Sequence, residues 1–240
     1  MLMSLPADGL AVVVGARGGI GTALLDHLKN ELVFSRVMAL SRSSAPPIDL
    51  LEEASIAQAA QVIRDLNQPV RLVIDATGFL SGTGPQGDNF QPEKSWGQLN
   101  AVQMAYAFAV NAIGPALLMK YFLPLLPRQG KAVFATLSAK VGSIGDNRLG
   151  GWYSYRASKA ALNQLVHTAA VELKRRQPDA LCVALHPGTV DTRLSAGFAK
   201  AGLEVQSPQE SARRMLAVIE GLNAADSGGF FNHDGAVLSW

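Results

Sequence analysis

The sequence predicts a doubly wound α/β fold, in which a parallel β-sheet lies between two layers of helices in a single domain. Apolar runs rich in β-branched residues alternate with helical patterns along the chain, as is typical of parallel sheets covered on both faces. The 240 residues are 48% hydrophobic and 17% charged, which allows one large core to be buried. We therefore expect one domain over residues 1–240.

The expected elements alternate as such a sheet requires. The strand candidates are residues 10–14, 36–40, 72–75, 131–137, 181–186 and 229–232. The helical stretches are residues 19–31, 56–66, 95–125, 153–176 and 209–223. Pro46 and Pro47 interrupt the stretch between the second strand and the second helix, so no further strand is expected there.

Three loops rich in glycine and proline follow strand candidates, at residues 79–93, 139–152 and 188–207. In a doubly wound sheet, ligands bind outside the carboxyl ends of the strands. These loops are therefore predicted to form a substrate pocket. Trp152, Tyr153 and Phe198 are candidates for an apolar lining, and packing in the core or at an interface explains them equally well.

Charge and cysteine content exclude several classes of protein. The formal charge of +2 is not clustered, and the longest basic run, Lys174 to Arg176, is typical of a solvated helix end, so no nucleic-acid partner is expected. The single cysteine, Cys182, excludes an internal disulfide and suits a reducing compartment. The N-terminus lacks the basic region of a signal peptide. We expect a cytoplasmic protein.

Residues 95–119 carry no charge and are long enough to span a bilayer. We expect a helix buried against the sheet or a partner subunit instead, and no membrane contact. With the helix of residues 153–176, this segment carries more apolar surface than one sheet face covers, which predicts a homodimer or homotetramer. The residues that argue against a lipid environment are Gln98, Asn100, Gln103, Asn111, Gly114 and Pro115.

The run from Ala11 to Gly21 has the pattern of a strand, a tight turn and the start of a helix. Glycines let the backbone approach a pyrophosphate, which the N–H groups of the helix N-terminus then bind. The pattern predicts a dinucleotide site, the alternative being a tight turn that binds nothing. The candidate cofactor residues of the turn are Gly15, Arg17, Gly18, Gly19, Ile20 and Gly21.

The loop after the second strand indicates which dinucleotide is bound. An acidic residue there would bind the ribose hydroxyls of NAD, whereas Arg42 offers donors suited to the 2′-phosphate of NADP. Ser41 and Ser43 add donors, and Arg17 adds a second positive charge. NADP is therefore favoured over NAD, with an exposed loop charge as the alternative for Arg42. Asp49 is either an acceptor for the adenine amino group or a helix N-terminal carboxylate.

Tyr155 and Lys159 lie four residues apart in a helical stretch and so share one face of the helix. A phenol titrates near pH ~10, and an adjacent ammonium is expected to lower that value. Ser138 supplies a hydroxyl for a substrate oxygen. The alternative is a structural role for Ser138, as a helix-cap or loop hydroxyl. Tyr153 is a rival phenol without a lysine partner, because its i+4 neighbour is Ala157. The combination predicts hydride transfer.

At these motifs the chain resembles the short-chain dehydrogenases/reductases, and within them the C-factor-like carbonyl reductases, over essentially all 240 residues. The resemblance implies a Rossmann-type sheet, an NAD or NADP cofactor, and the catalytic set Asn111, Ser138, Tyr155 and Lys159. Asn111 stands at a position similar to the family's asparagine site, where the asparagine holds a water that leads to the lysine. The alternative is that Asn111 is a buried amide that satisfies backbone groups of the helix. The cofactor residues implied in the same way are Ala76, Gly78, Tyr155, Lys159, Pro187, Gly188, Val190 and Thr192.

The chain also departs from the family pattern. Val14 stands where a threonine usually precedes the first glycine, and Asp75 stands where an asparagine is usual, so it acts only as an acceptor. Residues 143–152 lengthen the gap between Ser138 and Tyr155, as in C-factor-like members. The changes at Val14 and Asp75 bear on the tightness of cofactor binding rather than on the chemistry.

The resemblance implies reversible hydride transfer between NADP(H) and a small-molecule carbonyl or secondary alcohol. Two other functions stay open. One is a dinucleotide-binding signalling or regulatory protein of the C-factor type. The other is a sugar-nucleotide epimerase or dehydratase, which is disfavoured because few residues follow Pro187 and Gly188 to build a larger substrate domain.

Overall fold

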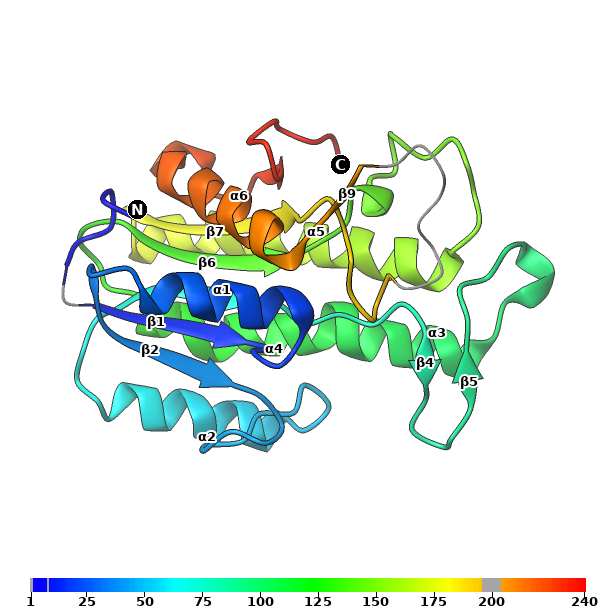
Figure 1. The fold of residues 1–240 in the computed structure, drawn as a ribbon, viewed down its shortest axis with the longest axis horizontal. Helices are drawn as coiled ribbons and strands as arrows, with labels where there is room; N and C mark the ends of the chain where they lie inside the picture. Colours follow the sequence, from blue (N-terminus) through cyan, green and yellow to red (C-terminus); the bar gives the residue numbers. More distant parts are fainter. Residues whose placement is uncertain (1, 8, 196–203) are drawn as a thin grey trace.

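A six-stranded parallel sheet with the order β10-β7-β6-β3-β1-β2 forms the centre of the molecule (Figure 1). It is seen in a computed structural model that describes residues 2–7, 9–195 and 204–240. The predicted doubly wound α/β fold is confirmed. The strands are β1 (Gly9–Val14), β2 (Phe34–Leu40), β3 (Val70–Asp75), β6 (Ala132–Leu137), β7 (Ala180–His186) and β10 (Phe230–Asn232).

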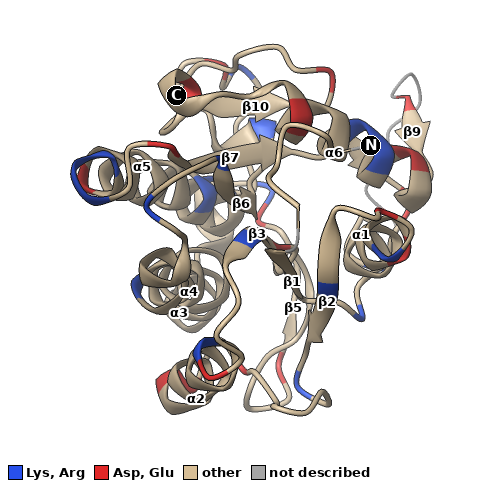
Figure 2. Ribbon diagram, turned by 90° about the vertical axis from the view of Figure 1, so that its left-hand side faces the viewer, with Lys and Arg blue, Asp and Glu red and all other residues tan. Residues whose placement is uncertain are grey.

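Helices cover both faces of this sheet, as Figure 2 shows in a view turned from Figure 1. One face is covered by α1 (Gly19–Lys29) and α6 (Pro208–Gly221). The other is covered by α2 (Glu53–Arg64), α4 (Gly114–Phe122) and α5 (Tyr153–Arg176). The three-layer arrangement therefore leaves the two ends of the sheet as the places where loops gather.

The strands are continuous apolar runs because both of their faces are buried. In β1, Leu10, Val12 and Val14 enter the core beneath α4 and α5, whereas Ala11 and Val13 enter the core beneath α1 and α6. All five are buried. The alternation follows from the two-residue period of a strand.

The segment expected as one helix over residues 95–125 is divided in the structure. A short 3₁₀ turn (Trp96–Gln98) precedes α3 (Ala101–Phe108), a π-helical turn (Ala109–Ile113) and α4, and a last 3₁₀ turn covers Leu123–Leu125. Residues 101–125 are long and apolar enough to cross a bilayer by length and composition alone. In this fold Leu118 and Phe122 are completely buried, which is typical of a core helix.

Two pairs of very short strands shape loops that were expected to be irregular. In residues 79–93, β4 (Gly82–Thr83) pairs with β5 (Asn89–Phe90) in an antiparallel hairpin beyond the carboxyl ends of the sheet strands (Figure 1). In residues 188–207, β8 (Thr189–Val190) pairs with β9 (Val205–Gln206) in parallel. Both loops are therefore partly ordered by backbone hydrogen bonds.

Candidate active site

The glycine turn after β1 forms a tight cradle that only glycine fits at two positions. Gly15 has a φ of +78°, in the left-handed region that favours glycine. A Cβ at Gly21 would lie 2.2 Å from the Gly15 carbonyl oxygen. Gly18 and Ile20 lie in the same turn and first helical turn, and α1 begins without a side-chain cap or an acidic residue. The free N–H groups at this helix end suit a phosphate anion.

Distant parts of the chain meet at this cradle. A Cβ at Gly19 would lie 2.9 Å from the Cγ2 atom of Thr192, so the loop after β7 lies against the start of α1. Ala76 lies on the other side, because a Cβ at Gly15 would lie 3.0 Å from the Ala76 carbonyl oxygen. The structure thus brings together residues that the sequence separates by more than a hundred positions.

The predicted NADP loop also lies beside the turn. The Arg17 Nη1 atom donates to the Ser43 Oγ atom at 2.5 Å, which joins the loop after β2 to the loop after β1. Arg42 is exposed and makes no hydrogen bond or ion pair with the residues that the structure describes. The Asp49 Oδ1 atom accepts from the Leu51 backbone N–H at 3.0 Å, so this carboxylate orders its own turn ahead of α2.

Lys159 lies inside the protein, in the second turn of α5. It is 2% exposed, and its Nζ atom donates to the Leu137 carbonyl oxygen at 2.7 Å. The same Nζ atom lies 5.9 Å from the centroid of the Tyr155 ring. A Cβ at Gly78 would lie 3.8 Å from the Lys159 Nζ atom and 3.8 Å from the Asn111 Oδ1 atom, so these three residues are neighbours.

The electrostatics of the pair differ from the sequence expectation. Burial raises the pKa of Tyr155 to about 12, whereas the neighbouring ammonium was expected to lower it. Burial also lowers the pKa of Lys159 to about 8, against an opposing effect of the Asp75 carboxylate. The expected direction of the Tyr155 pKa shift is therefore wrong. Desolvation of the phenolate outweighs the effect of the Lys159 ammonium, which donates to the Leu137 carbonyl rather than to the phenol. Tyr155 is thereby held as a neutral phenol at neutral pH.

Asn111 is completely buried in the π-helical turn. Its Oδ1 atom accepts from the Phe79 N–H at 2.7 Å. Its Nδ2 atom donates to the Phe79 carbonyl at 2.8 Å and to the Ser158 Oγ atom at 3.1 Å. The amide therefore joins the loop after β3 to α5, and the role toward a water and Lys159 stays a prediction.

Ser138 directly follows β6 and is 3% exposed. Its N–H donates to the Leu185 carbonyl at 2.8 Å, and its Oγ atom donates to the Asn163 Oδ1 atom at 2.6 Å. Sequence reasoning missed Asn163. The signal was present in the spacing, since Asn163 follows Lys159 by four residues and Tyr155 by eight, on one stripe of α5.

Asp75, which stands where the family usually has an asparagine, accepts three hydrogen bonds from two threonines. Its Oδ1 atom accepts from the Thr77 N–H at 3.0 Å and the Thr77 Oγ1 atom at 2.6 Å, and its Oδ2 atom accepts from Thr136 Oγ1 at 2.7 Å. Burial raises the pKa of this carboxyl, while the threonine hydrogen bonds and Lys159 oppose the rise. In these three hydrogen bonds Asp75 is the acceptor, as the sequence predicted.

The residues after β7 lie near the same edge of the sheet. Gly188 has a φ of +82°, and the Pro187 carbonyl accepts from the Ser211 Oγ atom at 2.7 Å. Val190 is buried in β8. Phe198, a candidate for the pocket lining, lies outside the described residues.

Glu93 is a second residue that sequence reasoning missed. It is 2% exposed, and both its oxygens accept from Ser154, one from the N–H at 3.2 Å and one from the hydroxyl. Its backbone carbonyl accepts from the Trp152 N–H. The carboxylate therefore caps α5 one residue before Tyr155. No local pattern marks it, because its partner lies 61 positions away.

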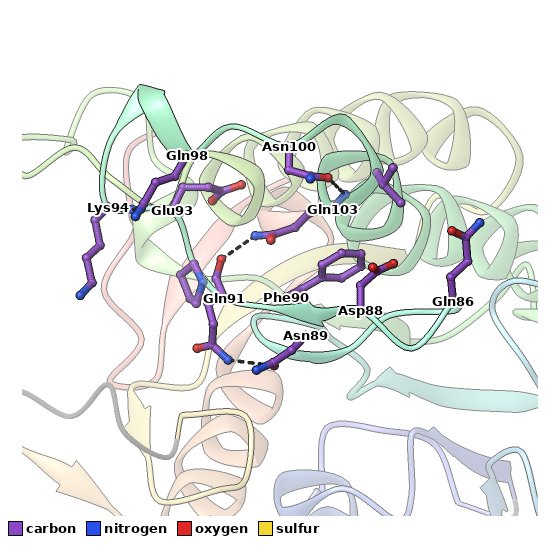
Figure 3. Close-up of a pocket in the computed structure, with 12 residues that line it drawn as sticks. Gln86, Asp88, Asn89, Phe90, Gln91, Glu93, Lys94, Gln98, Asn100 and Gln103 are labelled. Carbon is purple, nitrogen blue, oxygen red and sulfur yellow. Dashed lines mark hydrogen bonds between the residues drawn. The ribbon is translucent and has the colours of Figure 1, made fainter.

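Glu93 also forms part of the wall of an open cavity of about 710 Å³ beside β5 and the start of α3 (Figure 3). Glutamine and asparagine side chains dominate the wall, and the Gln103 Nε2 atom donates to the Gln91 carbonyl at 2.7 Å. None of the predicted catalytic or cofactor residues lines this cavity. It is therefore distinct from the arrangement around Tyr155.

Comparisons with known proteins identify relatives of the chain. Residues 16–225 match the family model described as enoyl-(acyl carrier protein) reductase. The chain is 37% identical to the C-signal of Myxococcus xanthus over 144 residues, which are 60% of this chain and 82% of that protein. It is 35% identical to the 1-hydroxy-2-glutathionyl-2-methyl-3-butene dehydrogenase of a Rhodococcus species over 131 residues. That match spans 55% of this chain and only about half, 56%, of the dehydrogenase.

Solved structures extend the likeness to the whole chain. The NADPH-bound carbonyl reductase from chicken fatty liver is 27% identical, with a TM-score of 0.84 over 99% of this chain and 96% of that one. The carbonyl reductase Sniffer of D. melanogaster shares the fold at 23% identity, with a TM-score of 0.81 over 98% of this chain and 100% of that one. Together with the family match over most of its length, these findings show that the chain belongs to the short-chain dehydrogenase/reductase family of NAD(P)-dependent oxidoreductases.

Proposed function

We propose that the protein catalyses the reversible reduction of a ketone or aldehyde with NADPH. The observation that carries the proposal is the meeting of Tyr155 and Lys159 from α5 with Asn111 and Gly78, beside Ser138 at the end of β6. A neutral, partly buried phenol with an ammonium behind it is the arrangement that protonates a carbonyl oxygen during its reduction.

The residues around the glycine turn suit a dinucleotide. Gly15 and Gly21 leave room where a side chain would clash, and the first turn of α1 offers N–H groups without a competing carboxylate. Arg17 and Arg42 supply two positive charges near Ser43, which favours a 2′-phosphate. The similarity to the NADPH-bound chicken carbonyl reductase supports NADP over NAD. Asp49, Ala76, Pro187, Gly188, Val190 and Thr192 complete the proposed cofactor set.

Each side chain then has a distinct task. The nicotinamide, when bound, supplies the hydride that the carbonyl carbon accepts. Tyr155 donates its phenolic proton to the carbonyl oxygen, and Lys159 stabilises the phenolate that results. Ser138 donates a hydrogen bond to the same oxygen and fixes its position. Asn111 holds the loop after β3 against α5 and, in this proposal, keeps open the path by which Tyr155 regains a proton.

The loops at residues 79–93, 139–152 and 188–207 are proposed to form the substrate walls of this single domain. The substrate is a small molecule, and nucleic acid and membrane have no part in the reaction. We further propose that the protein is a cytoplasmic homodimer or homotetramer.

One second function has a specific observation in its favour. The similarity to the Myxococcus C-signal covers most of that protein and supports a dinucleotide-binding signalling role as an alternative. The two functions are separated by following NADPH absorbance with a panel of ketones and aldehydes. Turnover that is lost in Tyr155→Phe supports the reductase, and no turnover with any carbonyl would leave the signalling role.

A further inference from the structure

Two buried side-chain amides lie close to the proposed catalytic residues, and their surroundings differ. Asn111 makes three hydrogen bonds, two with Phe79 and one with Ser158. Asn163 makes one, in which its Oδ1 atom accepts from the Ser138 hydroxyl at 2.6 Å. Among the described residues, the Asn163 Nδ2 atom has no hydrogen-bond partner, although the residue is only 3% exposed.

An unpaired N–H group at such a buried position is unusual and calls for an explanation. Leaving a buried donor unsatisfied costs free energy relative to pairing it. The asparagine amide is nearly symmetrical in shape, so a half-turn about its last torsion exchanges the oxygen with the nitrogen. After that half-turn, the Nδ2 atom points at the Ser138 oxygen and the orphan donor gains an acceptor. The oxygen left unpaired is tolerated better than an unpaired N–H.

The direction of this hydrogen bond matters for the reaction. A serine hydroxyl can donate one hydrogen bond, and in the observed arrangement Ser138 donates it to the Asn163 Oδ1 atom. Donation to a substrate carbonyl requires that the proton point elsewhere. The turned amide provides this, since its N–H donates to the Ser138 oxygen and leaves the hydroxyl proton for the substrate. Hydrogen bonds linked in such a chain also strengthen one another.

We propose that Asn163 is a positioning residue for Ser138, with its amide turning so that Nδ2–H donates to the Ser138 oxygen while Ser138 donates to the substrate carbonyl. This inference rests on the proposed reductase function. It adds Asn163 to the proposed active-site residues, on the same stripe of α5 as Tyr155 and Lys159. It also explains why the buried Asn163 Nδ2 atom has no hydrogen-bond partner among the described residues.

The first arm of the test compares two variants of almost the same shape. In Asn163→Asp the carboxylate can only accept, so the Ser138 hydroxyl keeps donating its hydrogen bond to position 163. In Asn163→Leu the side chain neither accepts nor donates a hydrogen bond. With an aldehyde that the wild type reduces, we expect kcat of Asn163→Asp to fall on the order of 10²-fold, as for the loss of one positioned donor. Asn163→Leu should lose less. Equal losses in the two variants would contradict the proposal.

The pH dependence separates this effect from a structural one. A protonated carboxyl regains a donor, and burial raises the pKa of such a group, so the activity of Asn163→Asp relative to wild type should recover as the pH falls. The titratable groups of the surrounding elements are Asp75, Lys140, Tyr155, Lys159, His167 and His186. They are common to both proteins, and any influence of the new carboxylate on Lys159 is followed separately through NADPH affinity. A ratio that stays flat with pH would overturn the assignment.

NADPH affinity, measured by fluorescence titration, should stay within about threefold of wild type in both variants. A parallel loss of affinity would mean that the new carboxylate acts through Lys159, four residues before it, and would also overturn the proposal. The matched control is Gln164→Glu, the same amide-to-acid change at the next position, on the exposed face of α5. Its rate should equal that of wild type.

The second arm does not depend on turnover. The pKa of the carboxyl introduced by Asn163→Asp is measured by NMR, alone and together with Ser138→Ala. If Ser138 donates to this position, removing its hydroxyl should raise that pKa by about one unit, and no change would exclude the contact. A wild type that reduces no carbonyl would refute the proposed function itself, whereas an active wild type with indistinguishable variants would refute only the role of Asn163.

Discussion

At the scale of single residues, burial rather than charge proximity sets the chemistry of the proposed site. Tyr155 keeps its proton because its phenolate would be desolvated, and Lys159 loses basicity for the same reason. The sequence identified both residues from their spacing but could not reveal the depth at which they lie. That depth depends on how β6 and α5 pack, and it reversed the expected direction of the Tyr155 pKa.

Replacing Tyr155 by phenylalanine removes the proton donor with little change of shape. We expect kcat for carbonyl reduction to fall by roughly 10²–10⁴-fold, the usual effect of one positioned acid, with NADPH binding nearly intact. Steady-state rates and a fluorescence titration of NADPH check the two halves of the prediction. Retention of more than about half of the wild-type kcat would remove Tyr155 from the mechanism.

The pKa of Lys159, at about 8, predicts a pH limit for the reduction. Below this value the side chain is a charged ammonium. As the pH rises through about 8 it becomes a neutral amine, and the stabilisation of the developing phenolate disappears. Tyr155, with a pKa of about 12, remains a proton donor throughout this range. We therefore expect the rate of reduction to fall as the pH rises above about 8.

The variant Lys159→Met provides the control for that limit. Its rate should be low and should no longer change with pH near 8, and its NADPH affinity should fall, because the same ammonium is proposed to bind the nicotinamide ribose. Rate–pH profiles of both proteins decide the matter. A wild-type profile without this limit, or an unchanged NADPH affinity in the variant, would contradict the roles given to Lys159.

Arg42 is expected to set the choice between the two dinucleotides. In Arg42→Asp a carboxylate replaces the cation, repels a 2′-phosphate and accepts from free ribose hydroxyls. The ratio of kcat/KM for NADPH to that for NADH should therefore fall. Arg128→Asp makes the same change at another exposed loop, just before β6, and should leave the ratio unchanged. A wild type that already prefers NADH would contradict the prediction.

At the scale of helices and strands, the sequence predicted which segments are regular but not where they are interrupted. The apolar pattern of residues 95–125 continues without a break, yet the backbone widens into a π-helical turn at Asn111. That turn directs the amide at Phe79, a contact across 32 positions that no local pattern contains. The two-residue strands β4, β5, β8 and β9 were missed because such short segments show no periodicity.

The start of α5 depends on Glu93, which provides a prediction about stability. Trp152, at the N-cap position, does not cap the helix with its side chain, and the buried Glu93 carboxylate accepts from Ser154 in the first turn. Glu93→Ala would leave these donors unsatisfied, so we expect the free energy of unfolding to fall by about 1–3 kcal/mol. Glu93→Gln retains one acceptor and should lose less. Urea denaturation measures both, and an Ala variant as stable as wild type would exclude the cap.

At the scale of the whole molecule, apolar side chains remain exposed on the same two segments that carry Asn111, Tyr155 and Lys159. Around α3 they are Trp96, Leu99, Val102 and Ile113, at 78%, 46%, 48% and 54% exposed, and on α5 they are Leu165 and Val171, at 37% and 49%. Exposed apolar groups gathered on neighbouring helices are typical of a protein interface. The surplus of apolar surface that the sequence predicted for these segments is thus present in the fold.

We therefore expect the protein to assemble as a symmetric dimer or tetramer through these helices. Light scattering at micromolar concentration should give a multiple of 25.4 kDa, whereas a mass near 25.4 kDa would mean a monomer and contradict the prediction. Val171→Lys places a charge in the proposed interface and should shift the mass toward the monomer. Leu32→Lys changes a fully exposed apolar residue just after α1 and should leave the mass unchanged. Because the interface helices also position Asn111, Tyr155 and Lys159, the monomeric variant is expected to lose activity together with assembly.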